Sequence, residues 1–70
     1  MKTTKLIRRT ANTLRVYRLA CKENVNMEIQ SYLSMVLVEE IEKIQKKENI
    51  EFYSDVIELL EEILELGDYE

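Results

Sequence analysis

The chain has no histidine and no proline, and it holds only one glycine, Gly67, and one cysteine, Cys21. A lone cysteine cannot form a disulfide within the chain, so nothing in the sequence indicates an oxidising compartment. Without histidine, and with a single thiol, no zinc site is expected. The scarcity of glycine and proline, beside 46% hydrophobic residues, argues against disorder and against an all-β fold rich in tight turns.

Seventy residues make at most one compact domain. A core of this size rarely supplies more than about 3–5 kcal/mol without disulfides, a metal or oligomerisation. Self-association is the route that remains, so we expect a homodimer. No catalytic constellation is present: Cys21 lies on an apolar helical face without a base to activate it, and no glycine-rich phosphate loop exists. The sequence predicts neither an enzyme nor a bound cofactor or metal.

Long apolar runs are also missing. The longest, Met35 to Val38, is four residues, whereas a membrane-spanning helix needs about 18. Near the N-terminus Leu6 and Ile7 are followed at once by Arg8 and Arg9, which interrupts any signal-peptide apolar region. We therefore expect a cytoplasmic protein without a membrane partner.

Charge is distributed very unevenly around a net value of −4. Residues 1–22 carry seven basic groups and no acid, whereas residues 48–70 carry nine acids and no base. Such a split indicates a basic end for an anionic partner and an acidic end for a different one. The alternative is that the two ends attract each other, within one chain or between chains.

The middle of the chain shows the clearest helical pattern. Asn26 is a good N-cap, lysines crowd the last turn before residue 48, and Asn49 suits a left-handed C-cap. Apolar residues recur at the 3–4 spacing of one helix face, which predicts a helix from Met27 to Lys47. We assign its face to a dimer interface made of Ile29, Leu33, Val36, Leu37 and Ile41.

A second amphipathic helix is predicted from Asp55 to Leu66, with Ser54 as its N-cap and Gly67 as its end. It carries a wide apolar stripe opposite a row of glutamates and would be unstable alone. The stripe is expected either to bind a protein partner or to close the protein's own core. The partner-binding residues would be Val56, Leu60, Ile63 and Leu64.

The first segment is ambiguous. Residues 3–10 are rich in β-branched side chains, which favours a strand followed by a helix from about Ala11 to Glu23. That helix offers two apolar faces, one with Leu14, Tyr17 and Cys21 and the other with Val16, Leu19 and Ala20. One long helix from Thr3 is the alternative, because a helical stripe also runs from Ile7 through Ala11.

The order of a basic β-prone segment, a helix, an asparagine-containing turn and a second helix resembles the ribbon-helix-helix family of dimeric DNA-binding proteins. The stretches that carry the resemblance are Leu19 to Asn24 and Met27 to Leu33, within residues 3–47. In that family two strands pair into a ribbon that enters the DNA major groove, and the second helix holds a phosphate at its N-terminus. The resemblance implies a DNA-binding set of Lys2, Thr3, Lys5, Arg8 and Arg9.

The sequence thus predicts a mainly α fold. It would have one strand and two helices over residues 1–49, the dimerisation and DNA-binding region, and an acidic helix within residues 50–70. The predicted function is a small dimeric DNA-binding transcriptional regulator, such as an antitoxin or a mobile-element repressor, with duplex DNA and a protein as partners. The alternative is an all-α bundle of three helices that serves as a protein–protein interaction module, for example as an inhibitor of a phage or mobile-element protein.

Overall fold

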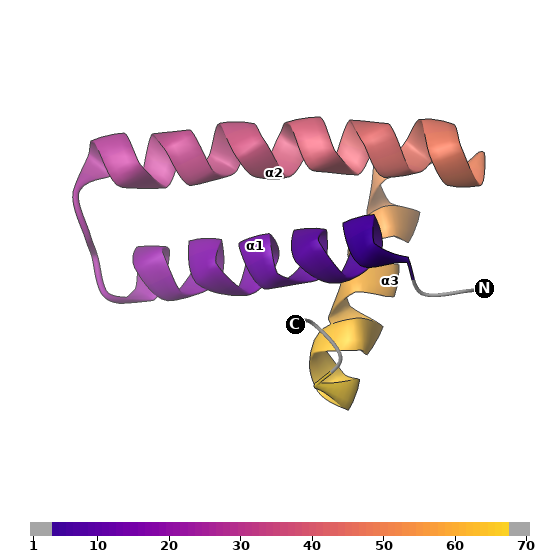
Figure 1. Cartoon of the computed structure of the whole chain (residues 1–70). Coiled ribbons are helices and arrows are strands. Elements are labelled where there is room, and N and C mark those ends of the chain that lie inside the picture. Colours follow the sequence, from indigo (N-terminus) through magenta and orange to yellow (C-terminus); the bar gives the residue numbers. More distant parts are fainter. Residues whose placement is uncertain (1–3, 68–70) are drawn as a thin grey trace.

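The computed structural model describes residues 4–67, which form three helices. Helix α1 spans Lys5–Lys22, α2 spans Met27–Glu48 and α3 spans Tyr53–Leu66. Helices α1 and α2 run antiparallel as a hairpin, and α3 crosses behind α1 near the end where α1 begins (Figure 1). The described part of the chain contains no strand, so the three-helix alternative is confirmed.

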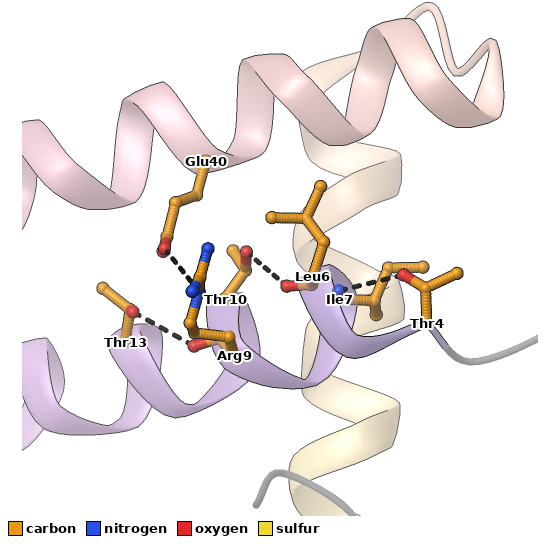
Figure 2. Close-up of polar contacts among 7 residues, drawn as sticks. All are labelled: Thr4, Leu6, Ile7, Arg9, Thr10, Thr13 and Glu40. Atoms are coloured by element: carbon orange, nitrogen blue, oxygen red, sulfur yellow. Dashed lines mark hydrogen bonds and ion pairs between the residues drawn. The ribbon is translucent and has the colours of Figure 1, made fainter.

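The strand expected over residues 3–9 is wrong for the described residues 4–9, and Thr3 lies outside the described range. Thr4 is the N-cap of α1, where its Oγ1 accepts a hydrogen bond from the Ile7 N–H at 3.2 Å. The hydroxyls of Thr10 and Thr13 donate to the carbonyls of Leu6 and Arg9, four residues earlier (Figure 2). The β-branched threonines are therefore accommodated within a helix.

Both ends of α2 match the sequence prediction closely. The Asn26 side chain accepts a hydrogen bond from the Glu28 N–H at 2.7 Å and caps the N-terminus. Asn49 ends the helix in the left-handed conformation, with φ of 56°, and its N–H donates to the Gln45 carbonyl. The observed helix extends only one residue beyond the predicted end at Lys47.

Helix α3 begins two residues earlier than predicted. Its N-cap is Phe52, which makes no side-chain capping bond, so the assignment of Ser54 as N-cap is wrong. At the other end the prediction is confirmed: Gly67 adopts φ of 74°, and its N–H donates to the carbonyls of Ile63 and Leu64. Glycine fits there because a left-handed residue with a Cβ would be strained.

The core lies where α3 crosses the hairpin. Each helix contributes three fully or almost fully buried apolar residues: Ile7, Ala11 and Leu14 from α1, Leu37, Ile41 and Ile44 from α2, and Val56, Leu60 and Ile63 from α3. The acidic helix thus closes the protein's own core, which is one of the two roles that the sequence analysis considered for its apolar stripe. Leu37, Ile41 and most of the stripe assigned to a partner are consequently covered by the chain itself.

Candidate interaction surface

Helix α3 covers one side of the α1–α2 hairpin and leaves the other side uncovered (Figure 1). The Gln45 side chain donates to the Glu51 carbonyl just before α3, which places α3 on the Gln45 side of α2. Val36 precedes Gln45 by nine residues, or two and a half turns, so it lies on the opposite side of α2. We call the uncovered side of the hairpin the open face.

The open face is built from one stripe on each helix of the hairpin. On α2 the stripe follows a 3–4 spacing, which keeps its members on one side of the helix. On α1 a matching stripe follows the same spacing. The members are Ile29, Leu33, Val36, Glu40, Lys43 and Lys47 on α2, and Leu6, Arg9, Thr13, Val16 and Ala20 on α1.

Toward the loop that joins α1 to α2, the open face is apolar. Ile29 is 52% exposed, and its neighbour Tyr32 is 64% exposed. Leu33 and Val36 are half-buried, as is Val16 on the facing helix. Apolar side chains are exposed on other sides of α2 as well, at Met27, Met35 and Val38, but the open face holds a continuous 3–4 stripe. Three of the predicted dimer-interface residues, Ile29, Leu33 and Val36, therefore lie together on the open face.

Toward the other end the open face becomes polar. Arg9 Nε lies 3.6 Å from Glu40 Oε2, and Glu40 reaches from α2 toward α1 to make this contact (Figure 2). The Arg9 side chain is 68% exposed, whereas that of Glu40 is only 12% exposed. The second carboxylate oxygen, Oε1, is buried and has no hydrogen-bond partner. A further hollow beyond this pair is lined by Leu6, Lys43 and neighbouring lysine side chains.

Polar contacts fix the loop end of the hairpin. The Gln30 amide donates to the Val25 carbonyl at 2.7 Å, and the Cys21 thiol donates to Gln30 Oε1 at 3.6 Å. A hydrogen bond with Cys21 raises the pKa of Tyr17 above its ordinary value, and Ser34 on α2 opposes the shift. These contacts join α1 to α2 beyond the reach of α3.

The described basic residues of the predicted DNA-binding set lie on α1, which carries six cations and no acid. Lys5 is exposed at the first helical position, Arg8 is half-buried and Arg9 is exposed, whereas Lys2 and Thr3 lie outside the described residues. No ribbon presents these side chains, because the described residues among them belong to a helix.

Much of this basic charge is engaged within the chain. Arg18 donates to Glu61 of α3 at 2.7 Å, and Arg9 lies beside Glu40 of α2. Arg8 and Arg15 also make interactions of their own. Attraction between the basic and acidic parts of one chain, the alternative weighed in the sequence, is thus present in the structure. An exposed pair such as Arg18 with Glu61 adds only about 0–1 kcal/mol.

The sequence missed Glu40 and Val16 as members of the surface. Val16 was visible as part of the second apolar face of the first helix. Burial divides both predicted faces, because Leu14 and Ala20 are buried whereas Cys21 and Leu19 are exposed. Glu40 gave no signal, because a glutamate beside Glu39 and Glu42 reads as part of a solvated face.

No model of a known protein family matches the chain, and no curated protein or solved structure matches it either. Across residues 4–67, no helix is both long enough and apolar enough to cross a membrane. Within the same residues, no cluster of three or more acidic or cysteine side chains has a geometry that could hold a metal ion. The proposals below therefore rest on the geometry of the chain itself.

Proposed function

We propose that this protein is a helical protein–protein interaction module that works as a homodimer, with the open face of one copy packed on the open face of another. The observation that carries the proposal is the apolar stripe of Ile29, Leu33 and Val36, which α3 leaves uncovered because it crosses the opposite side of the hairpin, near the start of α1. Burial of such a stripe is the main favourable term in association.

A second copy suits this surface because the open face complements itself. It has apolar side chains at one end and both a cation and a carboxylate at the other, so two identical faces can satisfy each other. Pairing of two hairpins gives a four-helix arrangement, a common way to bury 3–4 spaced stripes. It also enlarges a core that is small for independent stability. The outer sides of α1 and α3 would remain free for a further macromolecular partner.

A DNA-binding regulator is the second candidate. Its support is the charge of α1, which carries six cations and no acidic residue. Helix α1 would have to contact DNA directly, since the described residues provide no ribbon. Binding of this kind should weaken with salt by a log–log slope of about −0.9 per neutralised phosphate. In a titration of a labelled duplex, replacement of Lys5 or Lys22 by alanine should reduce this slope. Absence of binding at low salt would remove the candidate.

The test of the dimer uses a charge placed on the open face. Ile29→Lys puts an ammonium group into the apolar end, where a paired copy would bury it without a partner, so dimer formation should weaken by about a hundredfold or more. The matched control is Met27→Lys, since Met27 is also exposed and lies on α2 but outside the open-face stripe. Light scattering after size-exclusion chromatography gives the mass of each variant.

We expect wild type and Met27→Lys to elute at twice the 8.4 kDa mass of the chain, and Ile29→Lys to elute at the single mass with unchanged helix content. Equal masses for the two variants would contradict the proposal. A wild type that stays monomeric at about 100 µM would refute the homodimer. The open face would then be left for a different protein.

A further inference from the structure

Among residues 4–67, Glu40 is the one acidic residue that the fold buries, and the single chain leaves it incompletely satisfied. Its Oε2 is 3.6 Å from Arg9 Nε, which is longer than a good hydrogen bond, and its Oε1 has no partner. An ionised carboxylate removed from water without hydrogen bonds is costly. Oε1 is enclosed by the chain itself, so only the Oε2 side of the carboxylate, on a side chain that is 12% exposed, can meet a donor from whatever covers the open face.

The donor that the open face itself offers is Arg9. The Arg9 side chain is 68% exposed, and a guanidinium carries five N–H donors, of which Glu40 in the same chain contacts only one nitrogen. Its remaining N–H groups are available to a second carboxylate. One Arg9 can therefore serve two Glu40 side chains, one in its own chain and one in a paired copy.

Matching heights along the hairpin decide how two copies can pair. By height we mean the position of a residue along the axis of the hairpin. Because α1 and α2 are antiparallel with the same rise per residue, each step forward along α1 is matched by one step back along α2. Arg9 faces Glu40 at one height, and by the same rule Val16 is level with Leu33 and Ala20 with Ile29. The apolar end and the polar end of the open face thus occupy separate heights on both helices.

Two face-to-face arrangements have two-fold symmetry. With the axis across the helices, α1 lies on the partner's α1 in the opposite direction, and the apolar end of one copy covers Lys43 and Lys47 of the other. With the axis along the helices, α1 lies on the partner's α2, and equal heights stay together. When the two faces overlap along their whole length, only the second arrangement places the apolar end on the apolar end, so burial of apolar surface selects it.

We infer that two copies pair with their loops at the same end and that Arg9 of each copy donates to Oε2 of Glu40 of the partner subunit, giving this oxygen the short hydrogen bond that it lacks in one chain. This inference rests on the proposed function. The two arginines and two carboxylates form a closed ring of alternating charge around the axis. Such a ring fixes orientation, because a pairing without it covers Glu40 with only the 3.6 Å contact to Arg9 of its own chain.

A pair of charge reversals tests the ring. Arg9→Glu alone brings four carboxylates together, and Glu40→Arg alone brings four guanidinium groups together, so each variant should pair at least about tenfold more weakly than wild type. A mixture of the two restores alternating charge and should form heterodimers in preference to either homodimer. Native mass spectrometry distinguishes the three species if one variant carries ¹⁵N. Lys22→Glu, on an exposed part of α1 outside the open-face stripe, is the matched control.

A second measurement keeps Arg9 and Glu40 unchanged. In a Cys21→Ser background, chains with Thr13→Cys are mixed with chains with Val36→Cys, since these two positions share one height. We expect a disulfide between unlike chains to form much faster than one between like chains. A dimeric wild type whose reversed variants do not prefer each other, and whose mixed cysteines do not cross-link, would overturn the inference while leaving the homodimer intact. A monomeric wild type would instead refute the proposed function itself.

Discussion

Replacement of Leu60 by alanine should lower the free energy of unfolding by roughly 2–5 kcal/mol, the range for fully buried leucines. Leu60 is completely buried in α3, where that helix crosses the hairpin, and it packs in one cluster with Ile7 of α1 and Ile41 of α2. A fold of this size holds only about 3–5 kcal/mol in its core. The variant should therefore be largely unfolded at 37 °C, a temperature at which wild type is expected to stay folded.

The control for Leu60→Ala is Leu66→Ala, the same substitution in the same helix at a side chain that is 81% exposed. We expect this change to alter the free energy of unfolding by less than about 0.5 kcal/mol, because little apolar contact is lost. Urea titrations, followed by the helix signal in circular dichroism at about 222 nm, give the free energy of unfolding of each variant. Equal losses would mean that α3 is not part of the core.

Removal of α3 should have a still larger effect. A chain that ends at Asn49 keeps both helices of the hairpin but uncovers Ile7, Ala11 and Leu14 along the side that α3 seals. The remaining two helices cannot bury this stripe between them, so we expect loss of cooperative thermal unfolding, with aggregation as the exposed apolar surface associates.

Differential scanning calorimetry of the shortened chain checks this result. The full-length chain should show one cooperative transition, and the fragment should show none. A fragment with a transition like that of the full chain would instead mean that residues 50–70 form an accessory helix, free to bind a partner through Val56, Leu60, Ile63 and Leu64. The calorimetric experiment thus separates the two roles that the sequence permits for this helix.

Local signals in the sequence predicted the last two helices well. Asn26, Asn49 and Gly67 act through their own side chain or backbone conformation, so they mark the same helix ends in the sequence and in the structure. The segment before Ala11 could not be assigned in the same way. Its β-branched residues favour a strand locally, but Ile7 and Thr10 gain complete burial only as part of a helical face. Tertiary packing outweighs intrinsic propensity here.

The assignment of apolar residues to core or surface could not be made from periodicity alone. Leu33, Val36, Leu37 and Ile41 all belong to one wide apolar side of α2. A third helix packed to one flank buries Leu37 and Ile41 and leaves Leu33 and Val36 half-exposed. The flank that α3 takes depends on the short connection after Asn49 and on contacts such as that between Gln45 and Glu51, which no pattern in the sequence reveals.

The central claim is that the open face of one copy packs on the open face of another. Isotope-filtered NOE spectra test it most directly, on a sample mixed from labelled and unlabelled full-length chains. The account predicts contacts between copies that join the methyl groups of Val16 and Ala20 on one chain to those of Leu33 and Ile29 on the other. Contacts between copies that arise only from α3 would contradict this claim. So would the absence of any contact between copies at a concentration well above that used for light scattering.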